Sequence, residues 1–220
     1  MAFEASKISA RYLVVEGPIG VGKTSLAEAL ADRLKGRRLL ENPEGNPFLP
    51  LFYKDRWRYA FQTQLYFLLN RFRQQQELLQ FELFTQSVVS DYLFAKDRIF
   101  AILNLDEQEL GLYERLHPIL EAQVPKPDLV LYLQASTDVL LERIALRGRS
   151  YEKEIERGYL EEVNAAYSHF FLHYQESPLL IVNTNELDFV KNQEDFEELL
   201  KRIAEVKAGT HYYVPLGSRG

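Results

Sequence analysis

The feature that most constrains this chain is a glycine-rich segment near its start. The apolar run from Tyr12 to Val15 leads into the sequence GPIGVGKT, residues 17–24. Leu26, Leu30 and Leu34 then recur every four residues, as expected on the buried face of a helix. A strand, a glycine-rich turn and a helix in this order provide the context in which G-x-x-x-x-G-K-[ST] acts as a phosphate-binding loop.

In such a loop the backbone N–H groups surround phosphate oxygens, because glycine permits the required backbone angles and close approach. Lys23 would reach the β- and γ-phosphates, and the helix N-terminus would favour the same anion. The alternative, a chance glycine turn, is disfavoured because motif and context agree. We expect eight residues to hold nucleotide phosphates: Gly17, Pro18, Ile19, Gly20, Val21, Gly22, Lys23 and Thr24.

Composition indicates an ordinary globular protein. The chain has 220 residues, of which 46% are hydrophobic and 26% charged, so we expect one domain over residues 1–220. The net charge of −6 disfavours a general nucleic-acid or anionic-membrane surface. There is no cysteine, which excludes disulfides and thiolate chemistry. The N-terminus has no apolar signal region and no long apolar window exists, so a cytoplasmic protein is expected.

Short apolar runs separated by helical patterns predict an α/β fold. Besides the first strand there are four such runs: Arg37 to Glu41, Gln86 to Ser90, Asp128 to Leu133 and Leu179 to Val182. Near-continuous apolar runs suit strands buried on both faces of a parallel sheet. We therefore predict five parallel strands, and we expect residues 209–220, which carry no clear pattern, to fray.

Several helices are predicted between these strands. Trp57 to Gln80 has helical periodicity and is apolar on more than one side. Asp106 and Glu109 indicate a capping box at the start of another helix, which Pro118 either breaks or kinks. The remaining predicted helices are Asp138 to Arg147, ended by Gly148; Ile155 to Tyr174; and Glu194 to Lys207.

Two acidic residues lie where predicted strands end. Glu41 ends the second strand, and its carboxylate would emerge at the edge of the sheet where ligands of open α/β sheets bind. There it could accept a proton from an attacking hydroxyl, or it could be a solvated surface group. Asp91 closes the third strand, the Walker-B arrangement, and could bind Mg²⁺ together with Thr24. An apolar run ending in aspartate also describes many ordinary strands.

Three arginines, Arg143, Arg147 and Arg149, surround Gly148. Arg143 and Arg147 are one helical turn apart and so share a face. The three guanidinium groups could close over phosphoryl oxygens and stabilise the charge that develops during transfer. Alternatively, they only favour the negative end of the helix dipole.

Polar pairs at helical spacing supply further candidates. Gln64 and Arg71 are two turns apart in a mostly apolar helix, so they need partners if buried, whether another side chain or a ligand. His169 and His173 have the spacing of metal ligands, but no third ligand is evident.

Taken together, these residues resemble the deoxynucleoside kinases, in particular bacterial deoxyadenosine and deoxyguanosine kinases, which are related to deoxycytidine kinase. The resemblance extends from about Tyr12 to Phe189. It rests on GPIGVGKT, on Glu41 followed by NPFLPLFY, and on FQTQLYFLLNR, DYLFAKDRIF and LLERIALRGRSYE. It implies a P-loop NTPase fold with a parallel sheet of order 2-3-1-4-5, flanked by helices, and an arginine-rich lid at about residues 147–155.

The resemblance also implies residue roles. Glu41 matches the general base that takes the proton of the sugar 5′-hydroxyl. Tyr53 and Glu152 match groups that hold the 3′-hydroxyl. The matches to the residues that read the base edge are Gln64, Arg71 and Asp97, and the matches to the arginines around the phosphates are Arg143, Arg147 and Arg149.

One position departs from the family pattern. Many relatives have arginine and serine after the acid, whereas here Tyr92 follows Asp91. Some other cation would then have to contact Glu41 and the 5′-oxygen. Arg98, directly after Asp97, is one candidate.

We therefore expect an ATP-dependent and Mg²⁺-dependent kinase of deoxynucleosides, acting in nucleotide salvage and preferring deoxyadenosine or deoxyguanosine, with deoxycytidine as a further substrate. We also expect a homodimer, because the helix from Trp57 to Gln80 needs cover on more than one side. One alternative is a nucleoside-monophosphate kinase of the thymidylate type, which needs extra basic residues for the acceptor phosphate. The other is a regulatory P-loop protein, although Val182 to Asn185 lacks the N-K-x-D signature of GTPases.

Overall fold

A single parallel sheet forms the centre of the molecule. The computed structural model describes residues 8–80 and 87–215. The strands are β1 (Tyr12–Glu16), β2 (Arg37–Leu39), β3 (Val88–Ser90), β4 (Leu129–Gln134), β5 (Leu179–Asn183) and β6 (Thr210–Tyr213). Their order is β2-β3-β1-β4-β5-β6, and every pair is parallel. The α/β class and the order 2-3-1-4-5 are therefore confirmed.

Within the described residues the sheet has six strands, one more than the five that we predicted. Thr210 to Tyr213, in the segment that we expected to fray, pairs with Leu179 to Val182 as a sixth strand at the edge of the sheet. The first three of its four residues are exposed. The other strands were predicted from near-continuous apolar runs, which mark strands buried on both faces. This edge strand has no such run, so the sequence did not indicate it. Gln86, where the predicted third strand began, lies outside the described residues.

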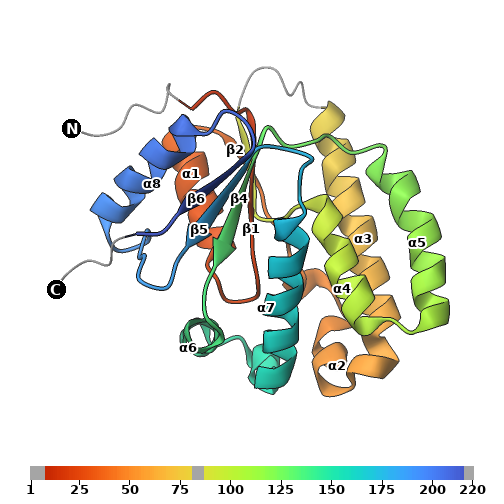
Figure 1. Cartoon of the computed structure of the whole chain (residues 1–220). Helices are drawn as coiled ribbons and strands as arrows, with labels where there is room; N and C mark the ends of the chain where they lie inside the picture. The colour runs from red at the N-terminus through yellow and green to blue at the C-terminus, as the bar shows by residue number, and fades with distance from the viewer. Residues whose placement is uncertain (1–7, 81–86, 216–220) are drawn as a thin grey trace.

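Helices cover both faces of the sheet (Figure 1). They are α1 (Lys23–Leu34), α2 (Leu49–Lys54), α3 (Arg56–Gln80), α4 (Asp97–Asn104), α5 (Glu107–Glu121), α6 (Thr137–Arg147), α7 (Arg157–Leu172) and α8 (Gln193–Glu205). Short 3₁₀ turns lie at Pro43–Gly45, Phe94–Lys96 and Ser150–Glu154. The sequence had indicated α1, α3 and α5 to α8 to within a few residues, but not α2 or α4.

Alternate residues of β1 serve two separate cores. Leu13 and Val15 pack with apolar residues of α1 and α8, whereas Tyr12 and Val14 pack with those of α3, α4, α5 and α7. Because successive side chains of a strand point to opposite faces, one apolar strand can supply both layers. Burial on both faces fixes β1 firmly, and with it the start of the glycine-rich loop.

Two local predictions at α5 can be compared with the structure. Asp106 caps the helix, accepting from the backbone N–H groups of Gln108 and Glu109 at 2.9 Å, and the reciprocal bond from its own N–H to Glu109 completes the capping box. Pro118 does not break the helix, because α5 continues through it to Glu121.

No helix within residues 8–80 and 87–215 combines the length and apolar character that crossing a membrane requires.

Candidate active site

The glycine-rich loop follows β1 directly and ends where α1 begins. Gly22, the residue before α1, has a φ of 104°, a conformation that L side chains rarely adopt. A Cβ at Gly17 would lie 2.5 Å from the carbonyl oxygen of Leu133 in β4, so only glycine fits there. The sheet thus holds the loop close, with the N–H groups of α1 at its end.

Lys23 extends across this loop. Its Nζ donates to the carbonyl oxygens of Gly17 at 2.7 Å and Pro18 at 3.0 Å. Burial lowers the pKa of Lys23 to about 8, and the charge of Lys96 acts in the same direction. An anion at the loop would favour the charged ammonium, so Lys23 is suited to bind phosphate.

Thr24 and Asp91 form a compact oxygen site beside the loop. The Thr24 hydroxyl donates to Asp91 Oδ2 at 2.5 Å, and the backbone N–H of Glu41 donates to Asp91 Oδ1 at 2.7 Å. Burial raises the pKa of Asp91, so a cation nearby would favour the ionised carboxylate. A hydroxyl and one carboxylate are the protein oxygens that Mg²⁺ uses beside substrate phosphates, and these two residues fit that ion.

The second candidate for a metal site was the pair formed by His169, in α7, and His173, which directly follows that helix. His169 and His173 lie near each other, with ring centroids 4.8 Å apart, and His173 Nδ1 lies 2.9 Å from the carbonyl oxygen of His169. Within the described parts of the chain, no three His, Cys, Asp or Glu residues are grouped as metal ligands.

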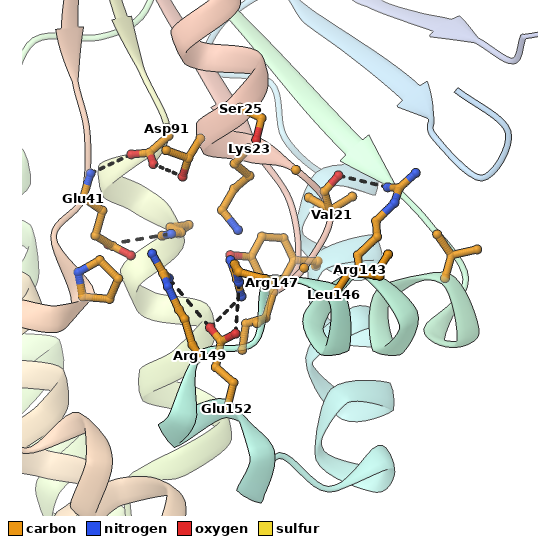
Figure 2. Close-up of a pocket in the computed structure, with 18 of the residues that line it drawn as sticks. Val21, Lys23, Ser25, Glu41, Asp91, Arg143, Leu146, Arg147, Arg149 and Glu152 are labelled. Atoms are coloured by element: carbon orange, nitrogen blue, oxygen red, sulfur yellow. Dashed lines mark hydrogen bonds and ion pairs between the residues drawn. The ribbon is translucent and has the colours of Figure 1, made fainter. Parts of the chain in front are cut away.

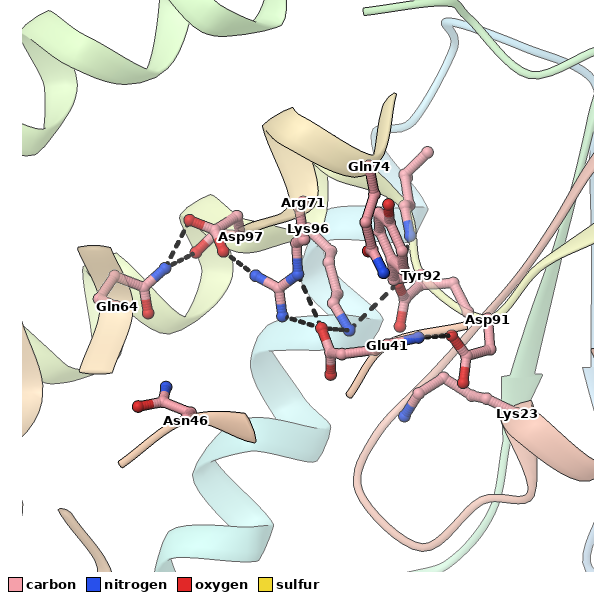
Figure 3. Close-up of polar contacts among 12 residues, drawn as sticks. Lys23, Glu41, Asn46, Gln64, Arg71, Gln74, Asp91, Tyr92, Lys96 and Asp97 are labelled. Carbon is pink, nitrogen blue, oxygen red and sulfur yellow. Dashed lines mark hydrogen bonds and ion pairs between the residues drawn. The ribbon is translucent and has the colours of Figure 1, made fainter. Parts of the chain in front are cut away.

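A chain of polar contacts runs from Glu41 into the interior (Figure 3). Arg71 on α3 donates to Glu41 Oε1 through Nε at 2.7 Å and also through Nη2, while its Nη1 pairs with Asp97 Oδ1. Gln64 Nε2 donates to the Asp97 backbone carbonyl and to Oδ2, each at 2.7 Å. Gln64, Arg71 and Asp97 therefore meet as the spacing and the resemblance implied, and Arg71 also joins them to Glu41.

The electrostatics of Glu41 follow from these contacts. Burial alone would raise its pKa, but the charges of Arg71 and Lys96 outweigh burial and lower the pKa to about 2. The contacts of both cations are to Oε1. Glu41 is thus held as a carboxylate, with Oε2 on the side that is free of these cations.

Two residues of this network were missed by sequence reasoning. Lys96 lies 4.0 Å from Glu41 Oε1 and 3.5 Å from Glu16 Oε2, and Tyr113 on α5 donates to Asp97 Oδ2 at 2.8 Å. A periodic signal existed for Lys96, because it shares a helical spacing of four with Phe100 and Asn104, and all three line the same pocket.

The sequence had suggested Arg98 as the cation beside Glu41, and this was wrong. Arg98 Nε donates to Glu114 on α5 at 2.7 Å, and its side chain is 54% exposed. Tyr92, which follows Asp91, is fully buried with its ring beneath Arg71. Lys96, two residues before Arg98, reaches Glu41 instead.

The segment after α6 brings two arginines to one glutamate (Figure 2). Arg147 donates to both carboxylate oxygens of Glu152, through Nε at 3.0 Å and Nη2 at 2.6 Å, and Arg149 Nη1 lies 3.7 Å from Oε1. Tyr53 on α2 stacks on Tyr151 of this segment, with ring centroids 6.1 Å apart. The segment therefore packs over α2 beside the pocket.

Arg143 lies apart from that pair. Its Nη1 donates to the Val21 carbonyl at 3.1 Å and the Thr184 hydroxyl at 3.0 Å, and its Nη2 to the Thr184 carbonyl at 2.6 Å. Figure 2 shows its guanidinium turned toward Val21, away from Arg147 and Arg149. Arg143 thus ties the glycine-rich loop to the loop after β5.

One pocket of about 850 Å³ joins these features. Its lining includes most of the residues selected from the sequence: Ile19, Gly20, Val21, Gly22, Lys23, Thr24, Glu41, Tyr53, Gln64, Arg71, Asp91, Arg143, Arg147, Arg149 and Glu152. Gly17, Pro18 and Asp97 lie outside the lining; Asp97 is fully buried behind Gln64 and Arg71. A phosphate-binding loop and a buried polar recognition site therefore open into the same space.

Comparison with known proteins identifies the group to which this architecture belongs. Residues 13–207 match the deoxynucleoside kinase family. This chain belongs to that family. Deoxyguanosine kinase of Bacillus subtilis (strain 168) is 35% identical over 90% of this chain and 98% of its own length. Deoxyadenosine kinase of Lactobacillus acidophilus is also 35% identical, over 89% of this chain and 95% of the relative.

A solved structure supports the same assignment for this deoxynucleoside kinase. Deoxyadenosine kinase of M. mycoides, with the products dCMP and a flexible dCDP bound, has a TM-score of 0.76 and 26% identity. The match covers 87% of this kinase and 98% of that chain. The chain is therefore a phosphotransferase that phosphorylates deoxynucleosides from a nucleotide donor.

Proposed function

We propose that this kinase transfers the γ-phosphoryl group of ATP to the 5′-hydroxyl of a purine deoxynucleoside, with deoxycytidine as a further acceptor, in nucleotide salvage. The observation that carries the proposal is the pocket in which Lys23 and Glu41 face the same space. Two relatives at 35% identity are named for deoxyguanosine and deoxyadenosine, which supports a purine acceptor.

The acceptor would be held between Glu41 and the polar set at α3. Glu41 Oε2 would accept the proton of the 5′-hydroxyl while Arg71 fixes Oε1. Gln64 offers both a donor and an acceptor to a base edge. Tyr53 and Glu152, which line the pocket beside the arginines, would hold the 3′-hydroxyl.

The donor would lie along the glycine-rich loop. Lys23 would contact the β- and γ-phosphates, and Arg147 and Arg149 would contact the transferred group once phosphate competes with Glu152 for them. Arg143, bonded to Val21, would set the shape of the loop. Thr24 and Asp91 would hold Mg²⁺, which supplies charge neutralisation to the phosphates.

The remaining features of the proposal concern the whole chain. We propose a homodimer, supported by exposed apolar residues on α3, α4 and α5: Trp57, Leu69, Ile102, Leu112 and Ile119. We also propose a cytoplasmic enzyme with no nucleic-acid or membrane partner, supported by the net charge of −6.

A phosphate-transfer assay tests the reaction directly. Labelled ATP is incubated with each deoxynucleoside, with each 5′-monophosphate and with no acceptor, and the products are separated by thin-layer chromatography. Transfer to a deoxynucleoside supports the proposal. Transfer only to monophosphates would identify a nucleoside-monophosphate kinase, and hydrolysis alone would identify a regulatory ATPase.

Glu41→Gln tests the general base. The variant should keep its fold and ATP affinity but lose about 10² in kcat, because general-base catalysis supplies roughly 10² to 10⁴. Glu77→Gln, on the same helix as Arg71 but 48% exposed, is the matched control and should behave as wild type. Unchanged turnover in Glu41→Gln would remove Glu41 from the mechanism.

A further inference from the structure

Lys96 is a buried lysine at the wall of the active site. Lys96 is only 2% exposed, although lysine is among the residues least often buried. It ends the 3₁₀ turn Phe94–Lys96, directly before α4, and it lines the pocket. Burying an ammonium group is unfavourable unless other charges or a ligand compensate it, so its position calls for a function.

Pairing with Glu16 does not by itself account for Lys96. Glu16 accepts hydrogen bonds from the backbone N–H of Gly17 at 2.9 Å, from that of Leu93 at 2.7 Å and from the Tyr167 hydroxyl at 3.1 Å. Lys96 Nζ stands 3.5 Å from Glu16 Oε2, which is longer than the ~2.8 Å of a charge-assisted hydrogen bond. Glu16 therefore has other donors, and the ammonium keeps donor capacity for a further acceptor.

Lys96 also lies between the two halves of the site. On one side its Nζ is 4.0 Å from Glu41 Oε1, the carboxylate proposed to bind the 5′-hydroxyl. On the other side its charge is close enough to lower the pKa of Lys23, the residue of the phosphate loop. Figure 3 shows Lys96 beside Arg71, with its side chain reaching toward the Glu41 carboxylate. A phosphoryl group passing from a donor at Lys23 to an acceptor at Glu41 would therefore come near this ammonium.

We propose that Lys96 is a catalytic cation that contacts the phosphoryl group during transfer. This inference rests on the proposed function. The 5′-oxygen forms a bond to the γ-phosphorus, and the bond from that phosphorus to the β,γ-bridging oxygen breaks, its electron pair leaving on ADP. The hydroxyl proton passes to Glu41, and Lys96 stabilises charge on the transferred oxygens.

The first experiment measures kcat, KM and thermal stability of Lys96→Gln. Turnover should fall about 10² to 10³, the typical loss when one preorganised donor to a transition state is removed. KM for both substrates should change less than about threefold, because a transition-state contact lowers kcat rather than ground-state binding. Arg98→Gln removes the same charge two residues away, outside the pocket, and should retain wild-type turnover.

A second variant separates catalysis from structure. In Lys96→Gln with Glu16→Gln, both charges of the buried pair are gone, so the melting temperature should rise above that of Lys96→Gln alone. The single variant Glu16→Gln completes a double-mutant cycle with wild type, Lys96→Gln and the double variant. Turnover should be about 10² lower in the double variant than in Glu16→Gln, because loss of the counterion does not replace the phosphoryl contact.

A third comparison separates direct contact from action through Glu41. Adding Lys96→Gln to Glu41→Gln should lower kcat by at least about tenfold more, since a direct contact persists without the carboxylate. The inference is overturned if Lys96→Gln keeps turnover within threefold, if only KM changes, or if Arg98→Gln is equally impaired. It is also overturned if removal of Lys96 has no effect in either the Glu16→Gln or the Glu41→Gln background. If wild type transfers phosphate to no deoxynucleoside, the proposed function fails instead.

Discussion

Arg71 connects catalysis with recognition, and its replacement by methionine should affect both stability and acid sensitivity. One guanidinium group pairs with Glu41 and with Asp97, and the Arg71 side chain is only 5% exposed. Arg71→Met keeps the apolar stem that packs along α3 but removes the charge. The Asp97 side chain, which is fully buried, then loses its cation and keeps the hydrogen bonds from Gln64 and Tyr113.

The magnitude can be estimated in two ways. Removing one partner of a buried ion pair costs about 3 to 5 kcal/mol of stability. Independently, the charges of Arg71 and Lys96 outweigh burial and lower the pKa of Glu41 from its ordinary 4.5 to about 2, a difference worth about 3 kcal/mol. Part of the 3 kcal/mol at Glu41 comes from Lys96 and would remain in the variant, whereas the loss of the Arg71–Asp97 pair adds to the cost. We therefore expect Arg71→Met to lower the free energy of unfolding by about 3 to 5 kcal/mol at pH 7.

The lowered pKa of Glu41 also sets how the stability of the protein changes with pH. Folded Glu41 binds its proton less readily than unfolded Glu41, so its contribution to stability is complete well above pH 4.5 and is lost as the pH falls toward 2. Between pH 7 and pH 3.5 this single carboxyl accounts for a loss of about 1.4 kcal/mol in wild type. In Arg71→Met the pKa of Glu41 returns toward its ordinary value, and this part of the pH dependence should shrink.

Urea unfolding at several pH values between 7 and 3.5 measures both effects. Arg73→Met is the matched control, because Arg73 lies two residues further along α3 and its side chain is 79% exposed. It should stay within about 0.5 kcal/mol of wild type at every pH, as substitutions at exposed sites usually do. If Arg71→Met loses no more stability than Arg73→Met, or keeps the wild-type pH dependence, the account of the buried ion pair is refuted.

Two predictions concern assembly and substrate choice. Light scattering at micromolar concentration should give twice the 25.7 kDa chain mass, because the exposed apolar residues of α3 to α5 need cover; the monomer mass would exclude the homodimer. Arg71→Met combined with Asp97→Ala should shift kcat/KM toward thymidine by roughly tenfold to a hundredfold, because thymine leaves the wild-type pair with unfilled hydrogen bonds. Equal wild-type efficiency on thymidine and purine deoxynucleosides would contradict this reasoning.

How far the sequence could predict the fold depends on how each element is buried. The runs in β1, β4 and β5 are almost wholly buried, and their continuous apolar character made them visible. The edge strand β6 has the sequence THYY, whose pairing with β5 depends on backbone hydrogen bonds rather than an apolar face. Such a strand is set by its neighbour in space, which sequence periodicity does not contain.

The arginine group shows a similar limit for the site. Spacing predicted that Arg143 and Arg147 share one face of a helix; both lie on α6, but their guanidinium groups have different partners. Arg143 bonds to Val21 and Thr184, whereas Arg147 bonds to Glu152 after the chain turns at Gly148, whose φ is 69°. The local pattern therefore found the three cations, and only the fold showed that Arg143 bonds to the glycine-rich loop whereas Arg147 bonds to Glu152.

Lys96 was missed for a related reason. A lysine in sequence is most often a solvated surface group, and Lys96 and Arg98 both adjoin Asp97, so the sequence did not show which of the two faces inward. The short turn Phe94–Lys96 before α4 rotates Lys96 inward and leaves Arg98 outside on Glu114. A shift of two residues around a helix start reverses which side chain faces the pocket.

The position of Arg71 also bears on how substrate selection reaches the reaction. Its Nε and Nη2 fix Glu41 Oε1, and its Nη1 pairs with Asp97, which Gln64 and Tyr113 hold in place. A base that fits against Gln64 and Arg71, the two members of this set that line the pocket, leaves the guanidinium where Glu41 needs it. A base that draws Arg71 aside would displace the carboxylate that receives the 5′ proton, and a misplacement of about 1 Å can cost roughly 10² in rate. Discrimination between bases should therefore appear in kcat as well as in KM, because recognition and proton transfer share one side chain.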